Sequence, residues 1–481
     1  MDKVYLTTTL PYVNADPHIG FALEIVQADI VARWGRLSGK EVFFNTGTDE
    51  HGLKIWRNAL EAGKNPKEYV DEYAARFDLL KEALNLSYDN FIRTTDPKHI
   101  SAAREFWRRC AEGGHIYKKN YSVKYCVGCE LEKTDSELED GRCPIHPNLE
   151  PEIIEEENYF FKFSAFRDKL LLLYEKNPDF VVPSYRFNEI KAFAERGFED
   201  FSVSRLKEKM PWGVPVPGDE AQVMYVWFDA LVSYVSAIGW PDDMAKFGKW
   251  WPVIQFAGKD NLRQQSAMWQ AMLMAAGLPP SKQIVIHGFM TSGGQKMSKS
   301  LGNVVNPFDL VKEYGADAVR YYLARHVHPF EDSDFTMKRF KEAYNANLAN
   351  GLGNLLSRIM KMATSNDVVF QEGWMKEKNI FAQTEHFYNE QKKEMENFNF
   401  QQSADAVWGV VSYLDGFIQK EQPFKKIKSD KETGERDIKY LLCHLMAVSN
   451  MLLPIMPKTA EIMEKTIKEN KMPETLFPRK D

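Results

Sequence analysis

Apolar residues recur with different periods along the chain, and the changes of period predict its elements. The apolar run Val4–Thr8 is typical of a buried strand, and residues 18–37 carry apolar side chains at helical spacing. Glu41–Asn45 predicts the next strand, so the chain opens with a strand–helix–strand unit whose two strands should be parallel. We expect the same sheet to continue in three later runs, Val223–Phe228, Val253–Ala257 and Ile284–His287.

The region from about Tyr117 to Asp219 has a different pattern, with short strand-like runs and frequent turn residues. This change predicts an insertion that splits the sheet-forming domain. From about Met337 onward apolar residues such as Leu348 and Leu352 recur at helical spacing, which predicts an all-α bundle. The expected fold is therefore α/β: a Rossmann-type parallel sheet, interrupted by the insertion and followed by the bundle.

These boundaries divide the chain into five expected parts. The two halves of the nucleotide-binding sheet domain are 1–116 and 220–290, and the insertion between them is 117–219. A lysine-rich loop and the segment after it occupy 291–337, and the bundle occupies 338–481. Parallel sheets of this kind bind ligands beyond the carboxyl ends of their strands, which is where Pro11–Gly20 and Asp49–Gly52 fall.

The composition is that of a globular enzyme, 44% hydrophobic and 27% charged. No apolar run approaches the roughly 20 residues that a bilayer span needs. The opening Met1-Asp2-Lys3 leads into a strand-like segment rather than a signal peptide, so we expect a cytoplasmic protein without membrane contact. The net charge of −6 argues against binding nucleic acid by bulk electrostatic attraction.

Two short motifs lie where a nucleotide fold handles phosphate. His18 and Gly20 are at the start of the predicted first helix, where unpaired backbone N–H groups and the helix dipole favour anions. Lys296 and Lys299 belong to a Lys-Met-Ser-Lys-Ser segment behind two glycines, and their ammonium groups can offset the charge of a leaving pyrophosphate. The segment lacks the spacing of a Walker A loop. Together the two motifs indicate a chain that activates a substrate with ATP.

Three of the five cysteines form a cluster with a histidine. Cys126-x2-Cys129 is followed, after 13 intervening residues, by Cys143-x2-His146. Two knuckles of this spacing are typical of a closed tetrahedral zinc site with three thiolates and one imidazole. Because the protein supplies all four ligands, we expect one structural Zn²⁺ that holds the insertion together.

In these motifs the chain resembles the class I aminoacyl-tRNA synthetases, whose two signatures read HIGH and KMSKS. Segments such as Thr9–Asn14 and Tyr225–Leu231 narrow the resemblance to the methionyl-tRNA synthetases of the single-zinc type, over nearly the whole chain. The resemblance implies that L-methionine is activated with ATP and Mg²⁺ to methionyl-adenylate and transferred to tRNA(Met), with release of pyrophosphate and AMP. It also implies that 291–337 holds the KMSKS loop and a stem-contact region, and that 338–481 is the anticodon-binding domain.

The resemblance further assigns residues to the small substrates. Asp49 would bind the α-amino group, and Trp227 and Tyr234 would close on the thioether, since sulfur packs favourably against aromatic rings. The methionine set is Leu10, Tyr12, Asp49, Trp227, Ala230, Leu231, Tyr234 and Gln265. The ATP set is His18, Gly20, Gly258, Asp260, Lys296 and Lys299, of which His18, Gly20, Lys296 and Lys299 are expected to be catalytic. Two positions in these small-substrate segments depart from the family pattern: Phe21 replaces the second His of the HIGH signature, and Gln265 stands where a His is common.

Asn354, Arg358 and Phe424 are the residues that the resemblance assigns to the anticodon. Asn354 and Arg358 are four positions apart and so share one helix face. Phe424 follows a proline at the place where the family has a Trp, and a Phe ring can still stack on a base. The chain ends soon after the bundle without a further dimerisation domain, so we expect a monomer.

Two other interpretations stay open on sequence grounds. A different class I synthetase is one of them, and the cysteinyl enzyme has a similar length. It selects its substrate with an active-site zinc, however, whereas this cysteine cluster lies inside the insertion. A catalytically retired tRNA-binding homologue is the other; Phe21 fits it, but the presence of His18, Lys296 and Lys299 argues against it.

Overall fold

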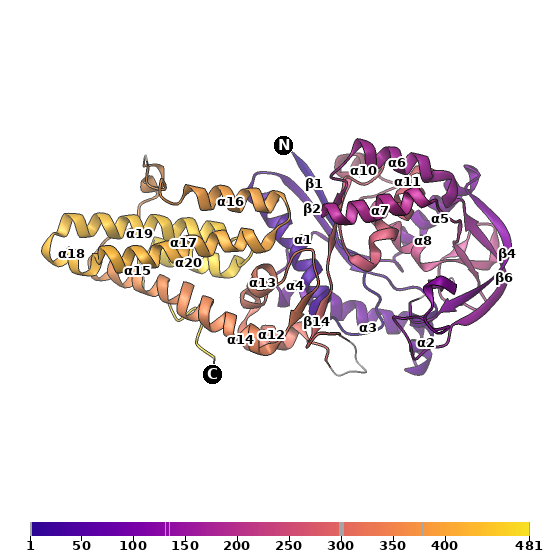
Figure 1. Cartoon of the computed structure of the whole chain (residues 1–481), viewed down its shortest axis with the longest axis horizontal. Helices are drawn as coiled ribbons and strands as arrows, with labels where there is room; N and C mark the ends of the chain where they lie inside the picture. The colour runs from indigo at the N-terminus through magenta and orange to yellow at the C-terminus, as the bar shows by residue number, and fades with distance from the viewer. Residues whose placement is uncertain (1, 130, 134, 298–302, 378, 481) are drawn as a thin grey trace. The chain divides into compact units, whose positions relative to one another are not determined.

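The computed structural model describes residues 2–129, 131–133, 135–297, 303–377 and 379–480 (Figure 1). The chain forms two compact units that interleave along the sequence. Unit 1 consists of residues 1–17, 40–79 and 88–286, and unit 2 of residues 18–39, 80–87 and 287–481. Among the helices formed by the described residues, none is both long enough and apolar enough to cross a membrane.

Unit 1 is built on a six-stranded sheet with the strand order β3-β2-β1-β12-β13-β7. The strands are β1 (Lys3–Thr7), β2 (Glu41–Thr48), β3 (Asn90–Arg93), β7 (Val181–Val182), β12 (Val253–Gly258) and β13 (Gln283–His287). β1 pairs in parallel with β2 and with β12, β2 with β3, and β13 with β7. The predicted parallel sheet is confirmed, as are its strands at the positions of β1, β2, β12 and β13.

Several helices of unit 1 bury aromatic side chains in a common core, among them α5 (Pro97–Glu112), α9 (Ser233–Ser236), α10 (Met244–Trp250) and α11 (Trp269–Ala275). Helices α2 (Leu53–Glu61) and α3 (Pro66–Asp78) lie outside this cluster. Phe106 of α5 stacks on Trp269 at 5.5 Å and meets Trp240 edge-on at 5.7 Å. The buried residues of α5 recur three and four positions apart, from His99 through Phe106 to Cys110, so one face of this helix is turned inward.

The prediction of a sheet strand at Val223–Phe228 was wrong. The segment is divided between β11 (Asp219–Met224), in a separate three-stranded sheet, and helix α8 (Val226–Leu231). β11 pairs antiparallel with β9 (Ser204–Leu206) and β10 (Pro215–Val216). A short apolar run has the same appearance in a buried strand and in a buried helix, and here the chain turns at Tyr225 between the two.

The insertion contains a four-stranded antiparallel sheet with the order β5-β4-β6-β8. β4 (Ile116–Cys126) and β6 (Glu152–Phe161) are its long central strands, and β5 (Leu131–Lys133) and β8 (Phe201–Ser202) flank them. Helices α6 (Arg167–Lys176) and α7 (Ser184–Arg196) follow. The insertion also supplies β7 to the parallel sheet, which the sequence did not predict.

Unit 2 contains the first helix of the chain, a small sheet and the predicted helical bundle (Figure 1). Helix α1 (Ile19–Leu37) and α4 (Leu80–Ala83) come from the first part of the sequence, and β14 (Met290–Ser292), β15 (Gln295–Lys296) and β16 (Ser333–Phe335) form the small sheet. The later helices are α12 (Pro307–Tyr314), α13 (Ala316–Arg325), α14 (Met337–Ala343), a π-helical stretch (Tyr344–Gly353), α15 (Asn354–Ser365), α16 (Glu385–Glu396), α17 (Phe400–Glu421), α18 (Pro423–Ser429), α19 (Lys431–Leu452) and α20 (Pro457–Glu469). The all-α C-terminal region is confirmed.

Candidate functional site

The first phosphate motif lies at the start of α1 in unit 2. His18 is the N-cap residue; its backbone is extended (φ −122°, ψ 168°), and its Nδ1 accepts a hydrogen bond from Gly20 N at 3.1 Å. A Cβ at position 20 would lie 2.9 Å from the His18 ring, so glycine leaves room for this cap. Because Nδ1 is the acceptor, the proton of the neutral ring is on Nε2. His18 is exposed, and its Nε2 can donate to an anion at the helix N-terminus.

The second phosphate motif follows a hairpin with a fixed base. β14 and β15 are joined by Gly293 and Gly294, whose φ values of +62° and +75° suit glycine. Asp334 of β16 accepts hydrogen bonds from Gly294 N at 2.7 Å and from Thr291 Oγ1 at 2.9 Å, and the Gly294 N–H lowers the pKa of this carboxyl. The backbone of Lys296 pairs with Thr291, whereas Lys299 lies outside the described residues.

In unit 1 the structure brings together three residues of the methionine set. Tyr12 and Asp49 are joined by a parallel bridge, in which Asp49 N donates to Pro11 O at 3.0 Å and Val13 N donates to Asp49 O at 3.3 Å. Asp49 is only 5% exposed. Tyr12 and Trp227 pack against one hydrophobic cluster, which consists of Leu53, Tyr125, Met210, Val223, Tyr225 and Val226. Tyr125 precedes the zinc-motif residue Cys126, so the base of the knuckle belongs to the same cluster, a link that the sequence did not predict.

The rest of the methionine set lies on several elements of unit 1. Gln265 is buried beside Tyr234: its Nε2 donates to the Tyr234 hydroxyl at 2.8 Å, and its Oε1 accepts from Gln255 Nε2 at 2.9 Å. The two partners therefore fix the orientation of the Gln265 amide. Ala230 and Leu231 are buried on α8, and Leu10 is half-buried after β1.

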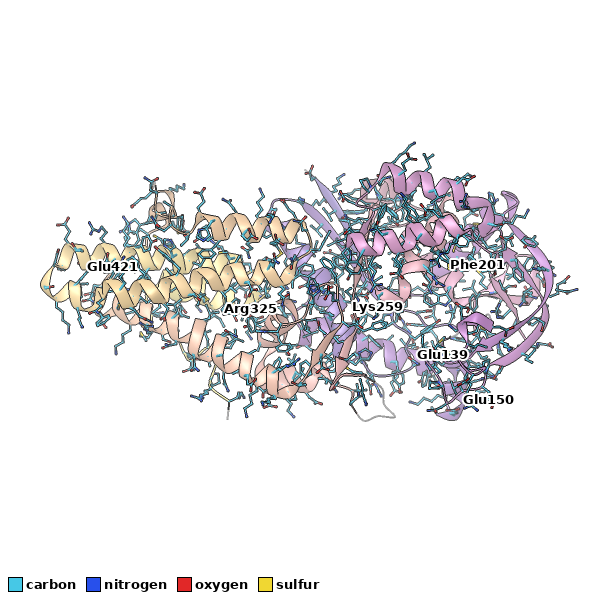
Figure 2. All side chains as sticks on the ribbon, in the orientation of Figure 1. Glu139, Glu150, Phe201, Lys259, Arg325 and Glu421 are labelled. Carbon is cyan, nitrogen blue, oxygen red and sulfur yellow. The ribbon has the colours of Figure 1, made fainter. Side chains whose placement is uncertain are left out.

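Gly258 and Asp260, two residues of the predicted ATP set, lie at the end of the parallel strand β12. Gly258 is its last residue, and Asp260 is exposed in the single turn Lys259–Asn261. Lys259, between them, is labelled in Figure 2. This is the carboxyl end of a central strand, the edge at which parallel sheets bind ligands.

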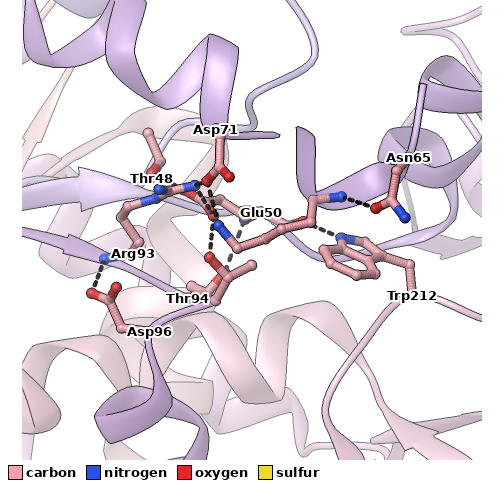
Figure 3. Close-up of polar contacts among 10 residues, drawn as sticks. Thr48, Glu50, Asn65, Asp71, Arg93, Thr94, Asp96 and Trp212 are labelled. Atoms are coloured by element: carbon pink, nitrogen blue, oxygen red, sulfur yellow. Dashed lines mark hydrogen bonds and ion pairs between the residues drawn. The ribbon is translucent and has the colours of Figure 1, made fainter. Parts of the chain in front are cut away.

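A buried ion pair next to Asp49 was not predicted from the sequence (Figure 3). The carboxylate of Glu50 accepts two hydrogen bonds from Arg93, from Nε at 2.6 Å and from Nη2 at 2.8 Å, and a third from Thr48 Oγ1 at 2.6 Å. The Glu50 carbonyl also accepts from Trp212 Nε1 at 2.5 Å. These contacts hold the main chain of the turn that carries Asp49. The sequence shows an acidic residue, Glu50, directly after Asp49, but its partner Arg93 lies 43 positions away and could not be identified from the sequence.

The four predicted zinc ligands converge in unit 1. One potential ligand atom from each of Cys126, Cys129, Cys143 and His146 lies within 4.8 Å of the others. Cys129 Sγ is 3.1 Å from His146 Nδ1 and 3.5 Å from Cys143 Sγ. A Cβ at Gly128 would lie 2.6 Å from the His146 ring, so only glycine lets the imidazole approach. Three sulfurs and one imidazole nitrogen at this separation fit a single tetrahedral zinc ion.

The three residues predicted to read the anticodon lie in the bundle of unit 2. Asn354 is exposed on α15, and Arg358 on the same helix forms an ion pair with Asp415 of α17. Phe424 is on the short helix α18, and its side chain is 44% exposed. Glu421, which ends α17 just before this helix, is labelled in Figure 2. The exposure of Phe424 leaves its ring available for stacking.

The chain matches two protein-family profiles. One, described as tRNA synthetases class I (M), matches residues 4–150 and 134–360. The other, described as the anticodon binding domain of methionyl tRNA ligase, matches residues 371–478. Together they cover most of both units.

Curated relatives and solved structures agree with these matches. The methionine–tRNA ligase of Thermosynechococcus vestitus is 43% identical over 95% of this chain and 88% of its own length. That of Thermotoga maritima is 41% identical over 95% of this chain and 74% of its own length. A structure of the Mycobacterium tuberculosis methionyl-tRNA synthetase in complex with methionyl-adenylate superposes with a TM-score of 0.90 at 34% identity, and the match covers 100% of this chain and 99% of that one.

Proposed function

The chain belongs to the class I methionyl-tRNA synthetases, and from this premise we propose which of its residues perform each step. It is an aminoacyl-tRNA ligase: it activates L-methionine with ATP to methionyl-adenylate and pyrophosphate, and transfers the methionyl group to tRNA(Met) with release of AMP. The family matches support this function over a cysteinyl enzyme and over a retired homologue.

The grouping of Tyr12, Asp49 and Trp227 in unit 1 is the observation that carries the assignment of methionine-binding residues. Asp49 binds the α-ammonium group, because a buried carboxylate makes a strong charge-assisted hydrogen bond to a cation. Tyr12, Trp227 and Tyr234 surround the thioether, with Leu10, Ala230 and Leu231 as apolar walls. Gln265 takes the place of the usual histidine and is held by Tyr234.

The ATP-binding residues are assigned by the chemistry of each position. His18 donates through Nε2 to a phosphate oxygen, and Gly20 leaves the first turn of α1 open to the nucleotide. Lys296 and Lys299 offset charge on the departing pyrophosphate. Gly258 and Asp260 contact the ribose. Mg²⁺, carried by the ATP phosphates, neutralises part of their charge when it is bound.

One Zn²⁺ at Cys126, Cys129, Cys143 and His146 has a structural role in this proposal. We expect the purified protein to contain about one zinc ion per chain. Cys126→Ser should lose this zinc, and its insertion should become less stable. Cys443→Ala, which changes a buried thiol of the bundle, is the matched control and should keep the zinc. Protein purified without chelator and found free of zinc by metal analysis would refute the site.

The C-terminal bundle recognises the tRNA in this proposal. Phe424 stacks under an anticodon base, and Asn354 and Arg358 hydrogen-bond to base edges. The five parts expected from the sequence, 1–116, 117–219, 220–290, 291–337 and 338–481, describe the division of labour, and the enzyme acts as a monomer. Size-exclusion chromatography with light scattering tests the last point.

ATP–pyrophosphate exchange with each of the twenty amino acids tests the assignment of the small-molecule residues. Exchange should require methionine in the wild type, and Asp49→Asn should raise the KM for methionine, because an amide cannot neutralise the α-ammonium group. Glu220→Gln, which changes a carboxylate on the exposed part of β11, is the control and should behave as the wild type. An Asp49→Asn enzyme with an unchanged KM for methionine would contradict the role of this residue.

A further inference from the structure

Asp229 is a buried carboxylate held by two histidines from distant parts of unit 1. Its Oδ2 is 2.5 Å from His51 Nδ1, and its Oδ1 is 2.8 Å from His99 Nε2. Asp229 is 1% exposed, His51 5% and His99 0%. The other ring nitrogen of His99, Nδ1, is 3.0 Å from Ser236 Oγ. Each oxygen of the carboxylate therefore accepts from its own imidazole.

The carboxylate is charged in this environment. Burial alone would raise the pKa of Asp229, but the adjacent His51 and His99 outweigh it and lower the pKa to about 2. Taking a carboxylate out of water is costly, and an apolar side chain of similar size would fill the same space at lower cost. A charge at this position is therefore best explained by what its directed hydrogen bonds hold in place.

The three residues connect elements that carry the methionine set. Asp229 lies on α8, two positions after Trp227 and directly before Ala230. His51 lies two positions after Asp49, in the turn whose main chain is fixed by Glu50. His99 projects from the inward face of α5. A hydrogen-bonded path thus runs from the turn after β2, through Asp229, to α8 and α5.

We propose that Asp229 is a positioning residue for methionine recognition: through His51 and His99 it fixes α8 relative to the turn that carries Asp49. The proposal rests on the assignment of Asp49 and Trp227 to the amino acid. Asp229 touches neither substrate in this mechanism. It sets the distance between Asp49, which binds the α-ammonium group, and the residues of α8 that contact the methionine side chain. Loss of Asp229 should therefore weaken the binding of methionine and leave the binding of the ATP phosphates unchanged.

His99 provides a conservative rescue that separates positioning from packing. In His99→Gln the side-chain amide can place an N–H where Nε2–H was, whereas His99→Leu keeps a similar volume and removes the donor. Asp229→Asn removes the charge and leaves one acceptor for two donors. Asp219→Asn is the matched control, because this carboxylate of β11 is also ion-paired, to Lys118 at 2.9 Å, and lies outside the set.

The readouts are the KM values for methionine and for ATP in pyrophosphate exchange, together with the melting temperature. Asp229→Asn and His99→Leu should raise the KM for methionine about tenfold, the size of one lost charge-assisted hydrogen bond, with the KM for ATP within about twofold of wild type. His99→Gln should recover most of the loss, and Asp219→Asn should match the wild type.

The proposal is overturned if Asp229→Asn and His99→Leu keep a wild-type KM for methionine, or if the KM values for both substrates rise together. It is also overturned if His99→Gln is as impaired as His99→Leu. Should Asp229→Asn fail to fold, the two His99 variants decide alone. A wild-type enzyme without methionine-dependent exchange would instead refute the assigned function, so the two failures are distinguishable.

Discussion

Two buried carboxylates, one in each unit, are neutralised by different kinds of base. Asp29 of α1, in unit 2, pairs with Arg33 Nε at 2.8 Å and with Arg320 Nη1 at 2.7 Å, whereas Asp229 in unit 1 pairs with two imidazoles. A guanidinium keeps its charge over the whole pH range in which proteins fold. Asp29 is therefore held by permanent positive charges, and Asp229 by hydrogen bonds from two imidazole rings.

Asp29 and Asp229 also differ in the residues that surround them. Arg320 is fully buried and also donates to the carbonyls of Ile455 and Pro454, both at 2.9 Å, so α13 is tied to the turn between α19 and α20. Burial would raise the pKa of Asp29, but Arg320 and Arg33 lower it. The pair in unit 2 holds helices together, while Asp229 lies among residues assigned to the substrate. If Asp229 has the proposed role, a buried charge serves architecture in one unit and recognition in the other.

Removing the positive charge of Arg320 should have the largest effect on stability. Arg320→Met leaves Asp29 buried with one partner fewer and orphans the carbonyls of the α19–α20 turn, so we expect a loss of about 3–5 kcal/mol in the free energy of unfolding of unit 2. Chemical denaturation measures it. Arg325→Met is the control on the same helix: Arg325, labelled in Figure 2, pairs with the exposed Asp405, and its loss should be much smaller. Equal losses would remove the distinction between the two kinds of pair.

Lys299, which we propose to be catalytic, should affect rate rather than stability. Lys299→Ala should lower kcat of pyrophosphate exchange by about 100- to 1000-fold, because it removes a charge that matters most in the transition state. The KM for methionine should change far less. A change confined to the KM for methionine would show that the KMSKS segment binds the amino acid instead. Together with the Asp229 variants, this result separates catalysis in one unit from recognition in the other.

Acid should weaken unit 1 through Asp229. Its folded pKa of about 2 is below the ordinary Asp value of about 3.9, so its contribution is complete above about pH 4 and is lost as the pH falls toward 2. The shift corresponds to about 2 kcal/mol. The measurement is the difference in unfolding free energy between the wild type and Asp229→Asn over this range, which should shrink as the pH falls. A difference that stays constant down to pH 2 would contradict a charged Asp229.

The loss of Phe424 should affect only the recognition of tRNA, through a contact that involves no charge. Phe424→Ala should weaken aminoacylation of tRNA by the roughly 1–3 kcal/mol of a lost stack, about 5- to 150-fold. Pyrophosphate exchange, which needs no tRNA, serves as the internal control and should stay near wild type. A parallel loss in both assays would mean that the ring supports the bundle rather than the anticodon.

Features encoded by local pattern could be predicted from the sequence. The strands Val253–Ala257 and Ile284–His287 are apolar runs between turns, the cysteine cluster has metal-ligand spacing, and the bundle has a helical period over many turns. The prediction of a strand at Val223–Phe228 was wrong, because these six residues change from strand to helix at Tyr225. A segment this short shows neither the period of a strand nor that of a helix. Asp229, the residue directly after that run, is buried on α8 and faces polar partners.

Pairings between distant residues could not be predicted. Glu50 meets Arg93 over 43 positions, and Asp229 meets His99 over 130 and His51 over 178. Each of these residues looks like an ordinary surface acid or base in the sequence, and only the tertiary fold makes it buried and paired. The residues assigned to methionine were named through family resemblance, whereas the contacts that hold them in position came from the structure.

The short strand β7 has a consequence for anyone who would shorten this enzyme. Val181–Val182 belongs to the insertion, yet it forms the edge of the parallel sheet beside β13. Excision of 117–219 would strip that edge and leave the backbone donors and acceptors of β13 open to strands of other molecules, the usual route to aggregation. The insertion therefore cannot be removed as a separate module. A shortened synthetase, or a chimaera of two relatives, should retain these two valines or provide another strand in their place.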